Sequence, residues 1–120
     1  MTEPIRLVYI GRLPRTNTMF FNPKQDYWFR EKALKQWGWM PMAATRRAVV
    51  TITRVLGRGE RFFDDDNFER AFKGARDGLT NKYGCYIVDD SPNWSHFDYH
   101  QDETRRHQGP RIEVTVEYTE

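Results

Sequence analysis

The chain has 120 residues, a length that suits one compact domain, which we expect to span residues 1–120. Its aromatic content of 15% excludes a disordered chain, and its single cysteine, Cys85, excludes an internal disulfide. The net charge is only +2, but residues 1–63 carry 12 Lys and Arg against 4 Asp and Glu, whereas residues 64–120 carry 7 against 13. A basic half can meet phosphates while an acidic half holds a metal ion, unless the two halves interleave in the fold.

The chain shows no stretch that is long and apolar enough to span a bilayer. Met1–Ile10 lacks the basic segment and long apolar segment of a signal peptide. We therefore expect a cytoplasmic protein with no membrane partner.

The first half of the chain predicts a strand, a helix and a second strand. Ile5–Ile10 is apolar and β-branched, as strands are. Asn22-Pro23 is typical of a helix start, and Gly38 can end that helix after about Trp37. Arg46–Leu56 reads as a central strand whose apolar start predicts burial on both faces. The buried side of the helix is expected to hold Tyr27, Ala33, Leu34 and Trp37.

The second half predicts a helix over about Asn67–Lys82 and then three strands, Tyr86–Val88, Trp94–Gln101 and Pro110–Tyr118. A polar, mobile loop is expected over Asp102–Gly109. The order β-α-β-α-β-β-β predicts an α+β domain, with two main helices packed on a mixed, mostly antiparallel sheet of four to five strands. At 100° per residue, the packed face of the second helix should carry Phe68, Ala71, Phe72, Ala75 and Leu79, and the charged face Asp66, Arg70, Lys73 and Asp77.

Five aspartates flank this second helix: Asp64, Asp65 and Asp66 before it, and Asp89 and Asp90 after it. Gathered carboxylates repel one another, and the usual compensating ion is Mg²⁺ or Mn²⁺. In an extended segment Asp64 and Asp66 would point the same way, and Asp90 or Asp89 would approach from the strand beyond the helix. Such a site can activate water for attack on a phosphodiester.

Cations on the same helix face complete this hypothesis. Lys73 lies two turns beyond Asp66 and can contact a scissile phosphate, and Arg70 can do the same. A structural explanation stays open, because first-turn acids stabilise a helix dipole and Asp66 with Glu69 approximates a capping box. The segment Asp89–Pro92 is also ordinary turn chemistry.

The segment from Arg61 to Gln101 combines these features in one order and resembles the RusA-type Holliday junction resolvase family, which phages and prophages often carry. The spacing from Asn67 to Lys73 is similar to that of the phage-type members. In place of the arginine that commonly precedes the first aspartate of the family stands Phe63, and Arg61 is the nearest cation. The resemblance is carried by Asp64-Asp65-Asp66-Asn67, Lys73, Asp77-Gly78-Leu79, Gly84 and Val88-Asp89-Asp90-Ser91-Pro92.

The resemblance implies a RusA-like fold and a metal held by Asp64, Asp66 and Asp90, with Asp89 auxiliary and Lys73 as the catalytic lysine. It implies Mg²⁺ dependence, for which Mn²⁺ can substitute, and a homodimer that makes paired nicks across a four-way junction of branched DNA. The host compartment would be the bacterial cytoplasm.

The expected function is therefore a metal-dependent, structure-selective endodeoxyribonuclease that resolves four-way junctions. One alternative is a catalytically inactive, resolvase-like protein that binds branched DNA, and another is a structural phage protein whose aromatic residues form an interaction surface. The candidate DNA-binding residues are Arg12, Arg15, Arg58, Arg61, Arg70 and Lys73.

Overall fold

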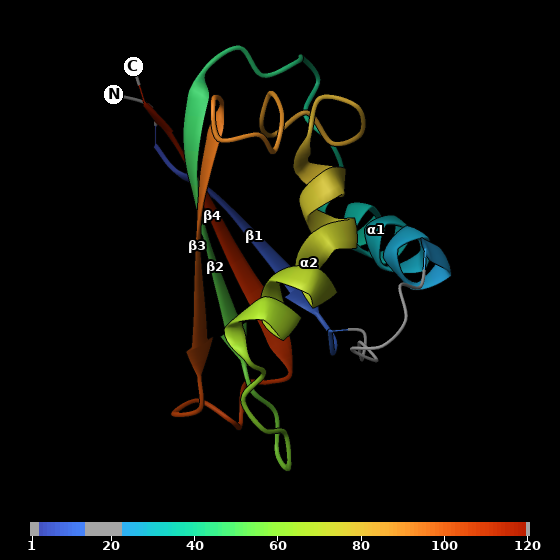
Figure 1. Cartoon of the computed structure of the whole chain (residues 1–120), viewed down its shortest axis with the longest axis vertical. Helices are drawn as coiled ribbons and strands as arrows, with labels where there is room; N and C mark the ends of the chain where they lie inside the picture. Colours follow the sequence, from blue (N-terminus) through green and yellow to red (C-terminus); the bar gives the residue numbers. More distant parts are fainter. Residues whose placement is uncertain (1–2, 14–22, 120) are drawn as a thin grey trace.

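The computed structural model describes residues 3–13 and 23–119, without the side chains of Pro23, Asp65 and Asp66. Two helices lie against one face of a four-stranded mixed sheet, which confirms the predicted α+β class (Figure 1). No helix in these ranges is both long and apolar enough to cross a membrane. In chain order the elements are β1 (Ile5–Ile10), α1 (Pro23–Trp37), β2 (Arg47–Val55), α2 (Asp65–Leu79), β3 (Ser95–Asp102) and β4 (Arg111–Thr119).

The strand order in the sheet is β1-β4-β2-β3. β4 runs antiparallel to both neighbours, and β2 pairs in parallel with β3, to which it is joined through α2. The predicted strand Tyr86–Val88 is wrong: only an isolated bridge joins Thr80 to Ile87. The chain turns tightly here instead, since the N–H groups of Tyr86 and Ile87 both donate to the carbonyl of Leu79 at 2.9 Å.

The core lies between the helices and one face of the sheet. Along β2 the residues alternate, so Val50 and Ile52 are fully buried while Val49, Thr51 and Thr53 are half-buried. The prediction that β2 is buried on both faces is therefore wrong, because α1 and α2 cover the same face (Figure 1). The helices and the sheet meet through Phe29, Ala33, Phe68, Phe72, Ala75, Val114 and Val116.

Helix α1 ends as predicted, at Gly38, which adopts a φ of 74° and donates its N–H to the Leu34 carbonyl at 2.7 Å. Its buried side contains Ala33 and Leu34, but Tyr27 is 46% exposed and Phe29 occupies the core instead. The expectation for Tyr27 is wrong because α1 turns its Asp26 and Phe29 side toward α2. The predicted cap, Asn22, lies outside the described residues.

The two helices touch through their backbones. A Cβ atom on Gly74 of α2 would lie 2.2 Å from the carbonyl oxygen of Asp26 on α1, which leaves no room for a side chain. Beside this crossing, Arg70 donates from Nη1 to both carboxylate oxygens of Asp26, at 2.9 and 3.1 Å. This contact fixes the position of α2, and with it the candidate site.

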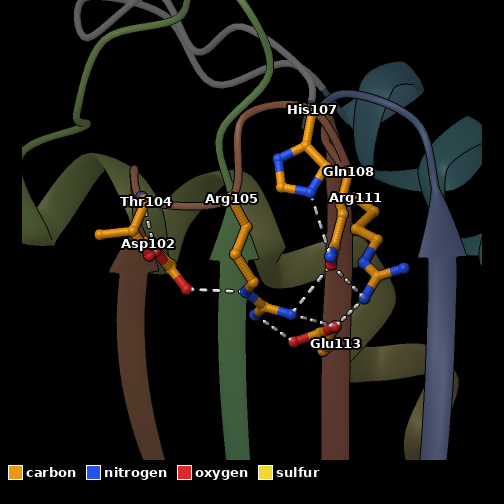
Figure 2. Close-up of polar contacts among 7 residues, drawn as sticks. All are labelled: Asp102, Thr104, Arg105, His107, Gln108, Arg111 and Glu113. Atoms are coloured by element: carbon orange, nitrogen blue, oxygen red, sulfur yellow. Dashed lines mark hydrogen bonds and ion pairs between the residues drawn. The ribbon is translucent and has the colours of Figure 1, made fainter.

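The connection between β3 and β4, expected as a mobile loop, is held by a network of charges (Figure 2). Arg105 lies at its centre, with Nε 2.9 Å from Asp102 Oδ2 and Nη2 2.7 Å from Glu113 Oε1. Arg111 also donates to Glu113, and Thr104 donates to Asp102 through its N–H and its hydroxyl. The end of β3 is thereby tied to the start of β4.

This network predicts a specific acid sensitivity. Hydrogen bonds from Thr104 and Arg105 lower the pKa of Asp102 to about 2, and Arg105 likewise lowers the pKa of Glu113. A lowered pKa in the folded state means that the stabilisation is fully present above the ordinary carboxyl pKa and is lost as the pH falls toward about 2. We expect the free energy of unfolding to decline over that interval, and Arg105→Ala to make the decline shallower. Urea titrations from pH 5 to about pH 2 measure both slopes, and equal slopes would contradict the prediction.

Candidate metal and nucleic-acid site

Helix α2 carries most of the predicted catalytic residues. It begins at Asp65, earlier than expected, and ends at Leu79, because the N–H and hydroxyl of Thr80 both bind the carbonyl of Asp77, at 3.1 and 2.8 Å. Its charged side is the predicted one, with Arg70, Lys73 and Asp77 half-buried at the surface. Its packed side is also confirmed, since the buried residues are Phe68, Ala71, Phe72, Ala75 and Leu79.

Asp64 is the N-cap residue of α2, exposed and extended, with φ −60° and ψ 152°. Its carboxylate makes no capping hydrogen bond and is therefore not used by the helix start. The capping box built on Asp66 is wrong, because Asp66 lies inside the first turn. For the same reason, Asp64 and Asp66 do not form the extended pair that was expected, since helical steps turn by about 100° per residue. The Asp66 side chain itself lies outside the described residues.

Asp89 and Asp90 form a tight turn before β3. Asp89 accepts the N–H of Asp90 on Oδ1 at 2.9 Å, and its carbonyl accepts the Ser95 hydroxyl at 2.6 Å. The turn chemistry considered for this pair is therefore present. It also orients Asp90 toward α2, where Oδ2 lies 3.5 Å from Nε of Arg76.

Arg76 is a functional candidate that the sequence pattern did not single out. It is mostly buried, and it donates from Nη1 to the hydroxyl of Tyr99 at 3.1 Å. Burial opposes its charge, but the bond to Tyr99 and the nearby carboxylates of Asp90 and Asp77 outweigh that effect and raise its pKa. The sequence feature that could have identified Arg76 is its position: it is a cation one residue before Asp77, on the edge between the packed and charged faces of α2.

Asp77 links Lys73 to the hollow that Asp89 and Asp90 border. Lys73 Nζ lies 2.9 Å from Asp77 Oδ2, and Asp77, Asp89 and Asp90 border one hollow of about 280 Å³ together with Lys82. Lys73 pairs with Asp77, whereas Asp90 pairs with Arg76, and the fold brings these two ion pairs to neighbouring residues of α2.

Asp64 lies at the opposite end of α2. Arg76, the partner of Asp90, follows Asp64 by a helical path of about 18 Å at the usual rise per residue. Within the side chains that the structure describes, no group of three or more His, Cys, Asp or Glu is arranged to hold a metal ion. That set does not contain the side chains of Asp65 and Asp66.

The predicted DNA-binding arginines gather at the end of the sheet where β1 and β2 finish. Arg12 follows β1, Arg58 lies in the turn after β2, Arg61 lies before α2, and all three are exposed. Asp64 lies at this same end. Arg70, in contrast, is bound to Asp26. Arg15 lies outside the described residues.

Arg54 was also missed. It occupies an inward position of β2, in register with Gln101 of β3, and is only 3% exposed. Its guanidinium donates to the carbonyl of Arg61 at 3.0 Å and to Gln101 at 2.8 Å, and it lies 4.0 Å from the centre of the Phe63 ring. The sequence pattern of β2 could have identified Arg54, because every second residue of the strand points inward and Arg54 follows the small and apolar residues of that inward series.

No family model matches the chain, and no curated protein or solved structure is significantly similar to it.

Proposed function

We propose that the chain is a RusA-type, metal-dependent endodeoxyribonuclease that resolves four-way DNA junctions by paired phosphodiester hydrolysis. The main support is that Lys73 and Asp90, which come from distant parts of the sequence, are paired with the neighbouring residues Asp77 and Arg76 of α2. A lysine beside carboxylates is the arrangement that a phosphate and its metal ion need.

The donor chemistry fits a hard divalent cation. The proposed ligands Asp64, Asp66 and Asp90, with Asp89 auxiliary, offer carboxylate oxygens, which Mg²⁺ and Mn²⁺ accept. Mg²⁺ takes only one or two carboxylates in many sites and fills its shell with water and substrate phosphates, so it needs no preformed protein cage. For Asp90 to share an ion with Asp64, the turn that carries Asp90 has to leave Arg76 and move toward the start of α2, because rotation of an aspartate side chain does not span the length of the helix.

In this proposal the chain's own residues bind and position the DNA. Lys73 holds the scissile phosphate, and the exposed arginines at the end of the sheet hold the backbone on either side. Two symmetric nicks require two sites related by a two-fold axis, so the active form is a homodimer. The setting we propose is the cytoplasm of a bacterial host, with a phage or prophage gene as the source.

The decisive experiment compares a labelled four-way junction with a linear duplex of the same sequence, each incubated with Mg²⁺, Mn²⁺ or EDTA. We expect paired nicks in the junction with either metal, and intact linear duplex under all three conditions. Cleavage that persists in EDTA, or equal cutting of both substrates, would refute the proposal.

One observation favours an inactive, resolvase-like binder of branched DNA as the second candidate. Lys73 and Asp90 are already neutralised by Asp77 and Arg76, so the network is balanced without a metal. A Mg²⁺ titration followed by thermal unfolding separates the two. The nuclease gains stability with metal by mass action, whereas the binder shows no shift and still binds the junction.

A further inference from the structure

A second hollow, of about 310 Å³, opens at the end of the sheet where β1 and β2 finish. It is bordered by the chain after β1 and by the segment between β2 and α2. Its charged and aromatic lining consists of Arg12, Arg54, Glu60, Arg61, Phe62 and Phe63.

This hollow has more positive than negative charge. The carboxylate among its described lining residues, Glu60, is occupied, because it lies 3.4 Å from Arg54 and accepts the N–H of Gly57 at 2.6 Å. Arg12 and Arg106 are both close enough to Arg54 to oppose its charge. Within the described residues, no hydrogen bond or ion pair engages the side chain of Arg12 or Arg61. The hollow can therefore accept an anion without breaking an existing contact.

The aromatic pair has two different roles. Phe63 is held in place, since Gln101 binds both its N–H and its carbonyl at 2.8 Å and Arg54 lies on its ring. Phe62, the preceding residue, is 51% exposed at the rim. A rigid backbone thus presents an open aromatic face next to the guanidinium groups of Arg12 and Arg61. That combination is the one by which proteins bind single-stranded nucleic acid.

We propose that this hollow binds one unpaired nucleotide of branched DNA. The base stacks on Phe62, and the flanking phosphates contact Arg12 and Arg61. Unstacking a base costs least where pairing is already interrupted, so a branch point supplies the nucleotide more readily than a duplex does. The inference rests on the proposed function and deepens it, because Asp64, a proposed metal ligand, directly follows Phe63, the last residue that lines the hollow.

The test measures binding in EDTA, so that cleavage plays no part. The probe is a four-way junction with 2-aminopurine at the branch point, compared with the linear duplex. We expect Phe62→Ala to weaken junction binding about tenfold and to lose the change in 2-aminopurine fluorescence, while Phe62→Trp keeps both. Arg12→Gln should lower the salt dependence of binding by about one unit of slope.

Trp39→Ala is the matched control, because Trp39 is 71% exposed and does not line the hollow. Thermal unfolding of each variant confirms the fold. If Phe62→Ala binds the junction as tightly as Trp39→Ala, or loses duplex binding equally, the inference fails. If junction binding does not depend on Phe62 but the protein still cuts junctions, the inference is refuted and the nuclease proposal stands. Phe62-dependent binding by a protein that cuts nothing would sink the nuclease proposal alone.

Discussion

Asp90→Asn is expected to reduce cleavage of a four-way junction by roughly 10²–10³-fold, while binding of the junction persists. The substitution keeps the size of the side chain but removes the charge that would hold a divalent cation. The readout is the single-turnover rate of nicking in Mg²⁺, together with the dissociation constant in EDTA. Because one negative charge facing the DNA is lost, binding is expected to be unchanged or tighter.

The control for this result is Asp98→Asn. Asp98 lies on the face of the sheet that the helices leave open, opposite the outward residue Thr51, and contacts His96 at 3.0 Å. It removes the same charge without touching the proposed site, and should leave the rate of nicking unchanged. Asp90→Asn also leaves Arg76 without its carboxylate, so thermal unfolding has to show that the variant folds. Nicking by Asp90→Asn at the wild-type rate would remove Asp90 from the metal site.

Asp64→Asn and Asp66→Asn extend this test to the other end of α2. Asp64 is exposed and makes no capping bond, so its substitution should lose cleavage with little loss of stability. If one ion is shared across the helix, all three variants lose cleavage to a similar extent, because residues that act together are not additive.

Gly74→Ala is expected to lower the free energy of unfolding by about 2–3 kcal/mol, a large effect for one methyl group. The added Cβ would lie 2.2 Å from the carbonyl oxygen of Asp26, so α1 and α2 have to move apart. Alanine also gains up to about 1 kcal/mol of helix propensity over glycine, which the estimate already includes. Urea denaturation measures the loss, and the melting temperature should fall by roughly 10 °C.

Gly78→Ala is the matched control on the same helix. Its added Cβ would meet the flexible side chain of Arg30 at 3.3 Å instead of a backbone. Arg30 can move by a few tenths of an ångström, so the gain in propensity should leave the protein equally stable or slightly more stable. An equal loss in both variants would show that the helix crossing is not the cause.

The sequence predicted those elements whose pattern depends on local rules. Ile5–Ile10 and the span from Pro23 to Trp37 match the observed β1 and α1, because β-branched residues, a proline start and a glycine stop act within a few residues. The packed face of α2 was also predicted correctly, since a 100° period places Phe68, Phe72 and Ala75 on one side.

Features that depend on how elements pack were not predictable in the same way. The apolar run at the start of β2 indicated burial on both faces of the sheet. The sequence does not show that both helices pack on the same face. Tyr27 was assigned to the core because its spacing fits, yet the close crossing at Gly74 rotates α1 so that Phe29 enters instead. The strand expected at Tyr86–Val88 found no neighbour in the sheet and became a turn.

In the candidate site, too, the features that depend on local sequence were predictable and those that depend on packing were not. The acids and Lys73 were found from residue type and spacing, and the structure pairs Lys73 with Asp77 and Asp90 with Arg76. The salt bridge from Asp90 to Arg76 could not be predicted from the sequence, because it depends on how the turn before β3 packs against α2. The grouping of all three metal ligands stays a prediction that the aspartate variants test.

The position of β4 has a consequence for how the chain folds during synthesis. β4 is the last strand in chain order, yet it lies between β1 and β2, where Val114 is opposite both Leu7 and Ile52. Until the residues of β4 leave the ribosome, β1 has no neighbouring strand to pair with, and its apolar side stays unpaired until late in synthesis. Removal of the 9 residues of β4 would therefore take away the centre of the sheet and not a peripheral edge.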